Sequence, residues 1–124
     1  MTTSYTVDKD GNSIETSKAT SKPSDRHFRN AWTLSGTVIS EDMTTAKTIF
    51  KNKIREVRNP LLEEQDVLFM KAMEDGDSTE QSTIASKKKE LRDAPATSAI
   101  TNAKTIAELK SAWDTDLLGA SPYA

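Results

Sequence analysis

The sequence predicts a mainly α-helical protein: a small N-terminal β-hairpin, then an antiparallel helical hairpin or bundle of three to four helices, with extended polar arms at both ends. Three observations support this fold class. Apolar residues return every three or four positions across residues 43–61, which is the period of an amphipathic helix. The short glycine turn at residues 75–77 would place two helices antiparallel. Apolar residues also gather in residues 28–91, which indicates a small central core.

Residues 1–25 are rich in Ser, Thr, Lys and Asp and are expected to form an extended N-terminal arm. Within them Asp10-Gly11 is a favourable turn between two short β-forming segments, so a hairpin is possible there. A lone hairpin is only marginally stable, and this one either needs a partner or is disordered. The stretch from Asp8 to Asn12 resembles a calcium loop, but it lacks the glycine and glutamate of an EF-hand, which favours a plain turn.

Residues 26–95 are expected to form the core, with a short β-hairpin followed by the helical hairpin. Trp32 and Leu34 are two positions apart, as one face of a strand requires, and a turn is predicted at Ser35-Gly36. Ser40 is the predicted N-cap of the first long helix.

Pro60 interrupts the helical pattern, because proline lacks the backbone donor and clashes with the preceding turn. Asn59-Pro60 therefore suits the start of a second helix that runs to about Glu74, with a single kinked helix as the alternative. Ser78, followed three positions later by Gln81, predicts a capping box and a further helix to about Arg92.

Residues 96–124 are expected to contain one short helix and a C-terminal tail. Thr105 and Glu108 form a second predicted capping box. A narrow apolar stripe through Ile106, Leu109 and Trp113 places the helix at about residues 105–114.

Composition excludes several classes of function. The net charge is −2, so there is no overall basic field to attract nucleic acid, and the local run Lys87 to Lys89 with Arg92 is interpreted as a solvated helix face. No apolar run approaches the roughly 20 residues of a membrane span, and no signal-peptide core begins the chain. We therefore expect no nucleic-acid and no membrane partner.

The sequence contains few of the residues and motifs that catalysis usually requires. The chain has no cysteine and a single histidine, His27, so nucleophilic triads are nearly excluded. The carboxylates Glu63, Glu64 and Asp66 are expected to lie on a solvated helix face, and there is no glycine-rich phosphate loop. We expect a non-enzymatic protein without cofactor or metal.

Tryptophan is both a large core residue and a frequent residue of binding hot spots. For Trp32 we favour the core, whereas Trp113, on a narrow stripe near the polar end, is as suited to a partner contact as to the core. The full set of candidate partner-binding residues is Trp32, Trp113, Arg58, Arg92, Tyr5 and Tyr123.

The segment Arg55-Glu56-Val57-Arg58-Asn59-Pro60-Leu61-Leu62, then Asp66, then Leu91-Arg92-Asp93-Ala94-Pro95, resembles the small tail assembly chaperones of tailed bacteriophages. The front segment Asp25 to Trp32 is similar to small proteins of cyanobacterial and other marine phages. The sequence has Val67 where the family often has tryptophan, and Pro60 is unusual there. The resemblance implies no cofactor and no catalytic residue. It also suggests that Arg58 or Arg92 pairs with Asp66 or Asp93 across the helical hairpin.

The resemblance, together with the absence of catalytic motifs, implies a structural or adaptor protein of the virion tail, expected in the host cytoplasm during assembly. Its expected partners are other phage tail or tail-fibre proteins, or a second copy of itself. A transient tail assembly chaperone is the alternative, and a capsid decoration protein is a further one.

Overall fold

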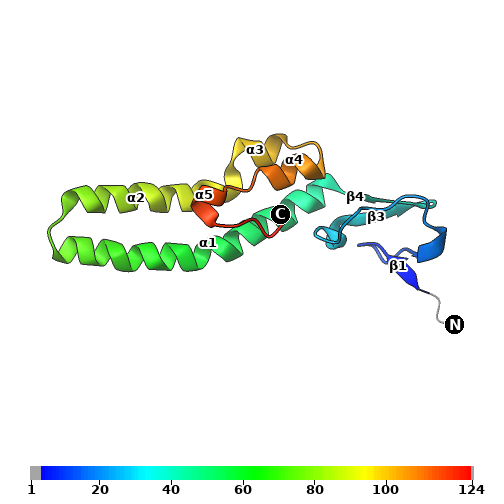
Figure 1. The fold of residues 1–124 in the computed structure, drawn as a ribbon, viewed down its shortest axis with the longest axis horizontal. Coiled ribbons are helices and arrows are strands. Elements are labelled where there is room, and N and C mark those ends of the chain that lie inside the picture. Colours follow the sequence, from blue (N-terminus) through cyan, green and yellow to red (C-terminus); the bar gives the residue numbers. More distant parts are fainter. Residues whose placement is uncertain (1–3, 124) are drawn as a thin grey trace.

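The computed structural model describes residues 4–123 and has an elongated shape, with β-hairpins at one end and a helical hairpin that projects at the other (Figure 1). The predicted fold class, mainly helical with a small N-terminal hairpin, is confirmed. The strands are β1 (Tyr5–Val7), β2 (Ser13–Glu15), β3 (Trp32–Ser35) and β4 (Val38–Glu41). The α-helices are α1 (Met43–Glu74), α2 (Ser78–Asp93), α3 (Ser98–Asn102), α4 (Ile106–Ser111) and α5 (Thr115–Leu118), with 3₁₀ turns at Thr16–Lys18, Arg29–Ala31 and Ala94–Ala96.

Two antiparallel hairpins form the β end of the molecule. β1 pairs with β2 around a turn in which Gly11 has a φ of +87°, and β3 pairs with β4 around Gly36, whose φ is +63°. Both glycines adopt a backbone conformation that side chains with a Cβ rarely reach. The hairpins predicted at Asp10-Gly11 and at Ser35-Gly36 are therefore confirmed.

The first hairpin is fastened to the second through the backbone next to its turn. The backbone N–H of Lys9 donates to the carbonyl of Trp32 at 3.0 Å, and the N–H of Leu34 donates to Oδ2 of Asp8 at 2.9 Å. These bonds join the N-terminal residues to the strand that enters the core. The expectation of an extended arm is thus corrected for residues 5–15, since a neighbouring strand of the same chain supplies the partner that the hairpin needs.

Asp8 shapes the turn rather than forming a calcium loop. Its carboxylate accepts hydrogen bonds from the backbone N–H groups of Asp10 and Asn12, at 2.9 and 2.8 Å. Burial raises the pKa of the Asp8 carboxyl, but the bonds from Leu34, Asn12 and Asp10 outweigh this effect and hold the pKa below its ordinary value. The carboxylate is already used by donors of the protein itself, as a plain turn requires.

The first long helix begins two residues later than predicted. Asp42, not Ser40, is the N-cap of α1, and its carboxylate accepts a hydrogen bond from the backbone N–H of Thr45 at 3.1 Å. Ser40 remains in β4, because the pairing of that strand continues until Glu41 lies opposite Trp32. Strand pairing therefore decides which of two suitable N-cap residues begins the helix.

A single helix, α1, passes through Pro60, so the predicted second helix starting at Asn59-Pro60 is wrong and the single-helix alternative holds. Figure 1 shows the axis of α1 changing direction near its middle. Proline removes one backbone hydrogen bond there. Ile54 is buried on the side before Pro60, while Val57 and Leu61 on either side of it pack against the core. This packing holds the helix together across the missing bond.

The two long helices form the predicted antiparallel pair, joined by a turn in which Gly76 has a φ of +66°. Asp77, one residue before the predicted Ser78, is the N-cap of α2 and accepts from the backbone N–H of Glu80 at 3.0 Å. The predicted capping box at Ser78 and Gln81 is accordingly wrong. Of two adjacent residues able to cap, the carboxylate also suits the positive end of the helix dipole.

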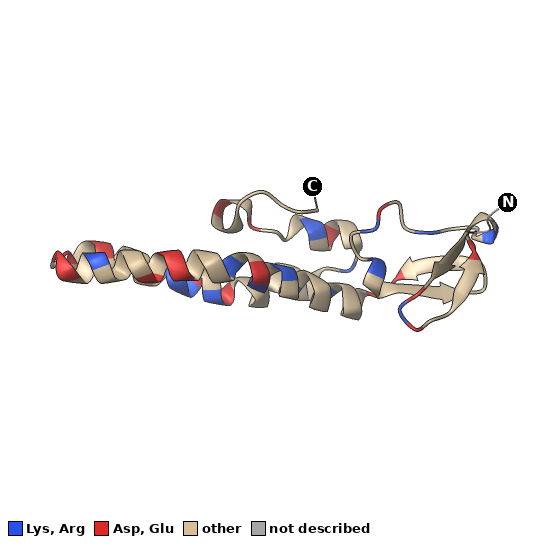
Figure 2. Ribbon diagram, turned by 90° about the horizontal axis from the view of Figure 1, so that it is seen from below, with Lys and Arg blue, Asp and Glu red and all other residues tan. Residues whose placement is uncertain are grey.

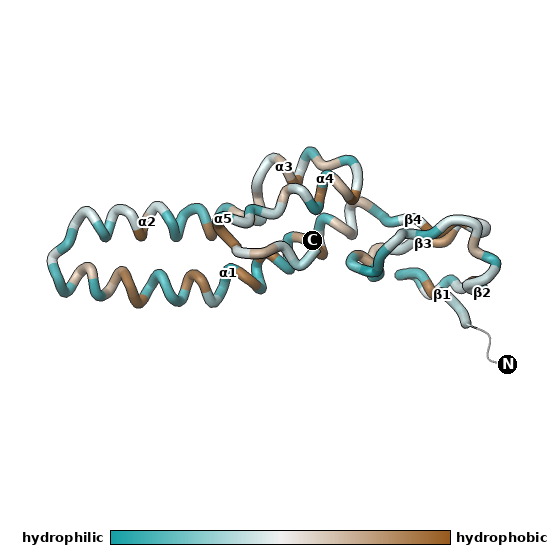
Figure 3. Tube along the Cα trace, in the orientation of Figure 1, coloured by the Kyte–Doolittle hydropathy of each residue, from teal (hydrophilic) through white to brown (hydrophobic). Residues whose placement is uncertain are grey.

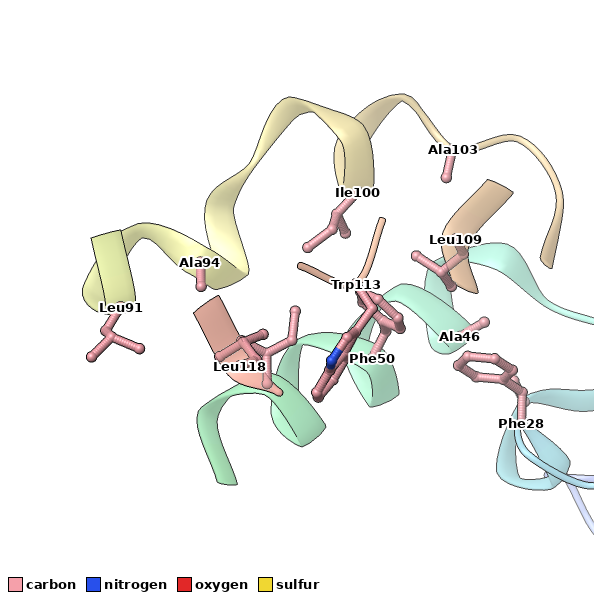
Figure 4. Packing of buried hydrophobic residues seen from close by; sticks show 12 residues of the cluster. Phe28, Ala46, Phe50, Leu91, Ala94, Ile100, Ala103, Leu109, Trp113 and Leu118 are labelled. Carbon is pink, nitrogen blue, oxygen red and sulfur yellow. The ribbon is translucent and has the colours of Figure 1, made fainter. Parts of the chain in front are cut away.

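The core lies around the first half of α1, and the C-terminal segment completes it (Figure 4). Its members are Phe28, Ala31, Ala46, Phe50, Ile54, Leu91, Ala94, Ile100, Ala103, Leu109, Trp113 and Leu118. α3, α4 and α5 fold back along α1, and the capping box at Thr105 and Glu108 is confirmed. The helix it begins ends at Ser111, and α5 follows instead of a tail.

Tyr123 is also part of this packing. Its ring stacks on Phe28 with centroids 4.9 Å apart and on Phe50 at 5.5 Å. The expected C-terminal arm is therefore corrected as far as residue 123. A chain with few large apolar residues uses those near its end to cover the aromatic side chains of its centre.

Candidate protein-binding surface

The outer part of the helical hairpin, residues 61–90, is here called the helical arm. It extends beyond the core, as Figures 1 and 2 show. Ala72 of α1 and Ile84 of α2 are the buried hydrophobic residues of the arm. These two residues bury little apolar surface for an arm of roughly thirty ordered residues. The arm therefore has little apolar packing of its own.

One side of the arm carries exposed apolar side chains. Val67, Met70 and Met73 follow at three-residue steps on α1, with 54%, 64% and 57% of their surface exposed. We call these three residues the outer strip. At 3.6 residues per turn, Met70 lies roughly 160° around the helix from the buried Ala72. Met70 consequently faces away from α2, while Val67 and Met73 lie roughly 140° and 100° around the helix from Ala72. Figure 3 shows several apolar residues along the outer half of α1.

Carboxylates border the outer strip. Asp66 and Glu74 lie four residues before and after Met70, and Glu63 lies seven before it, so all three share its side of the helix. Across α1 residues 62–74, Lys71 is the one basic residue. Figure 2 shows acidic residues at the tip of the arm, with acidic and basic residues mixed along its length. The surface thus combines an apolar centre with an acidic border.

Lys88 of α2 reaches across the arm. Its ammonium group lies 2.5 Å from Oδ1 of Asp66 and 5.6 Å from the centre of the Phe69 ring. The side chain of Asp66 remains 57% exposed, so the ion pair contributes about 0–1 kcal/mol. The basic run of α2 therefore serves partly to fix the register of the two helices.

The predicted pairing of Arg58 or Arg92 with Asp66 or Asp93 is wrong, although Arg58 does bridge the two helices. Its Nη1 donates to the carbonyl of Arg92 at 2.7 Å and to that of Leu91 at 3.4 Å. Carbonyls in the last turn of a helix lack intrahelical donors and carry the negative end of its dipole. A guanidinium from α1 satisfies them, which leaves Asp66 to Lys88.

The six candidate binding residues lie in different parts of the fold and do not form one surface. Trp32 and Trp113 are 3% and 5% exposed, so the core position favoured for Trp32 is confirmed, and Trp113, whose role the sequence leaves open, is buried as well. Trp113 donates from Nε1 to the carbonyl of Gly119 at 3.0 Å, and its ring centre lies 6.2 Å from that of Tyr123. Arg58 and Arg92 meet at the base of the arm, and Tyr5 lies exposed on β1.

Sequence reasoning did not identify the outer strip. The available signal was that apolar residues between positions 61 and 73 occupy several sides of one helix, more than a single partner helix can cover. Met70 and Met73 are exposed because α2 packs on another side of this part of α1 and the remaining helices cover the other half of α1.

Two of the pockets in the described part of the chain lie beside charged side chains. One of about 410 Å³ lies where the arm meets α5 and is lined by both acidic and basic side chains, among them Lys89, Asp93 and Asp114. The other, of about 530 Å³, lies beside the first hairpin and includes Lys22 and Arg26. Residues 4–123 contain no group of three or more side chains placed to hold a metal ion.

His27 is exposed at the edge of the aromatic core, where it lines a further pocket with Lys53 and Glu56. Its Nδ1 is 3.6 Å from Oδ1 of Asp25, and its ring meets Tyr123 edge-on with centroids 5.4 Å apart.

Comparison with known protein families, with curated protein sequences and with solved structures found no significant match to this chain. In the described part of the chain, none of the helices combines the length and the apolar character needed to cross a membrane.

Proposed function

We propose that this chain is a non-enzymatic structural or adaptor protein of a bacteriophage tail, which binds a tail or tail-fibre subunit through its helical arm. The observation that carries the binding role is the outer strip: Val67, Met70 and Met73 are more than half exposed on an arm that has little core of its own. Exposed apolar surface on a projecting element is characteristic of protein interaction sites. The phage assignment rests on the sequence resemblance at residues 55–66 and 91–95.

A transient assembly chaperone is the second candidate, because the resembling motifs occur in tail assembly chaperones. In the structure these motifs enclose the base of the arm, where Arg58 contacts the carbonyls of Leu91 and Arg92. A chaperone would use the same strip but leave before the particle matures. In either role the protein would be present in the host cytoplasm during assembly.

Quantitative mass spectrometry of purified mature particles tests the proposal. A fixed ratio to the tail proteins is the expected result, with the chain located in the virion tail. Absence from particles, with presence in infected cells, would favour the chaperone. A ratio equal to that of the major capsid protein would contradict both and indicate capsid decoration.

A further inference from the structure

We infer that the outer strip receives a basic amphipathic helix from a different protein, which lies along α1 and completes a three-helix bundle with the arm. This inference rests on the proposed binding role of the arm and specifies the chemistry of the partner. It depends on the shape of the strip, on the charges around it and on whether a second copy of this chain could cover it.

The shape of the outer strip suits a helical partner. Val67, Met70 and Met73 follow one another at three-residue steps, so their side chains form a ridge inclined at about 45° to the axis of α1. An amphipathic helix buries such a ridge with apolar residues of its own at three- and four-residue spacing. Methionine side chains adapt to different partner shapes, which suits a surface that accepts a helix.

The carboxylates beside the outer strip favour a basic partner. The neighbours of Met70 one turn away are Val67 and Met73 at three residues, and Asp66 and Glu74 at four. An approaching helix therefore meets an apolar centre with carboxylates beside it, and Glu63 extends this border by another turn. Lysine or arginine on the flanks of the incoming helix would pair with Glu63 and Glu74, since Asp66 is already paired with Lys88, whereas acidic flanks would be repelled.

A second copy of this chain does not suit the outer strip. A copy packed antiparallel with its Met70 on this Met70 would place Asp66 opposite Glu74, and a parallel copy in register would place each carboxylate opposite itself. The large exposed apolar residues found among residues 4–123 lie on β1, β4 and α1, and α2 has none. The basic run on α2 is thus not accompanied by apolar side chains that could fill the strip.

The test uses a dye-labelled designed peptide of about 18 residues with leucine on one helical face and lysine on the other, and an otherwise identical leucine–glutamate peptide. Fluorescence anisotropy with the full chain should show saturable binding of the lysine peptide and little binding of the glutamate peptide. The double variant Val67→Ser/Met70→Ser should weaken binding by about tenfold or more. Val38→Ser, which alters an exposed apolar residue on β4, is the matched control and should bind as the native chain does.

Two charge-reversal variants test whether the carboxylates beside the outer strip attract the peptide. Glu74→Lys should weaken the lysine peptide several-fold, while Asp116→Lys, an equal change of charge on the exposed surface of α5, should have little effect. Equal binding of both peptides, or loss of affinity with Asp116→Lys as large as with Glu74→Lys, would overturn the inference. Circular dichroism of each variant checks that the exposed substitutions leave the helices intact.

Sedimentation of the unliganded chain examines the second copy directly. A monomer at micromolar concentration is expected, and a dimer that dissociates in Val67→Ser/Met70→Ser would overturn the inference in favour of self-association. Peptide binding together with absence from particles would keep this inference and contradict a lasting virion role. Presence in particles with no peptide preference would do the reverse.

Discussion

The ammonium group of Lys110 donates a hydrogen bond of 2.5 Å to Oδ2 of Asp25, although the two residues are 85 positions apart in the sequence. The contact fastens the segment that precedes Phe28 to α4, beside the aromatic core. The contact between Lys110 and Asp25 therefore links the β end of the molecule to its C-terminal helices.

Lys110→Met should lower the free energy of unfolding at pH 7 by about 0.5–1 kcal/mol, because both partners remain partly exposed. The hydrogen bond from Lys110 is the main reason that the pKa of Asp25 lies below its ordinary value of 3.8. Its stabilisation is therefore present above that pH and is lost as the pH falls through the lower pKa of the folded state. Thermal unfolding at pH 7 and pH 3 should show a smaller acid loss in Lys110→Met than in Lys104→Met, an exposed control. Equal losses would contradict the prediction.

Glu41→Gln should have the opposite dependence on pH. Burial, reinforced by the nearby charge of Asp25, raises the pKa of the Glu41 carboxyl, and its Oε2 is buried without a hydrogen-bond partner among the described residues. The native chain is therefore favoured below the ordinary pKa of 4.5 and loses that advantage as the pH rises through the raised pKa. The glutamine variant should be about 1 kcal/mol more stable at pH 7 and differ little at pH 4. Urea titrations at both pH values measure this, and a destabilised variant at pH 7 would refute it.

Tyr123→Ala should destabilise the protein by about 1–3 kcal/mol, because the ring covers Phe28 and Phe50 and is only half-buried itself. Trp113 should become more exposed, since its ring meets Tyr123 edge-on. The measurement is urea unfolding followed by tryptophan fluorescence, with an emission shift to longer wavelength in the variant. Tyr123→Phe keeps the stacked ring and should behave as the native chain; a comparable loss there would show that the hydroxyl, not the stacking, is responsible.

Pro60→Ala should raise the free energy of unfolding by about 1–3 kcal/mol, because alanine restores the backbone donor that proline removes inside α1. Thermal circular dichroism should show a higher melting temperature. Pro122→Ala, outside the helices, is the control and should have a smaller effect. A lower melting temperature for Pro60→Ala would mean that the packing of Val57 and Leu61 depends on the change of helix direction.

Ile84→Ala should loosen the helical arm while leaving the core folded. Ile84 and Ala72 are the buried hydrophobic residues of the arm, and truncating the larger one costs about 2 kcal/mol of local stability. Hydrogen exchange should quicken across residues 61–90 and remain slow in the first half of α1. Ile100→Ala, at a fully buried core position, should instead destabilise the whole chain by about 2–5 kcal/mol. Uniformly faster exchange in Ile84→Ala would contradict a separately weak arm.

The sequence alone determined the features whose causes are local. Gly11 and Gly36 mark the two hairpin turns, because only a residue without a Cβ enters that conformation readily. The period of the apolar residues predicted α1, and the reciprocal bonds of Thr105 and Glu108 predicted the start of α4. Each signal depends on neighbours within a turn or two of the chain.

Tertiary structure decided the features that depend on residues distant in the sequence. α1 continues through Pro60 because core contacts outweigh one lost hydrogen bond, and it starts at Asp42 because β4 stays paired with β3 through Glu41. The C-terminal residues enter the core because Phe28 and Phe50 need covering, which buries Trp113 and occupies Tyr123. The same packing uses apolar residues after position 91 for the core and leaves Val67, Met70 and Met73 exposed. The candidate binding surface exists because residues far apart in the chain compete for burial, and sequence spacing does not determine which of them is buried.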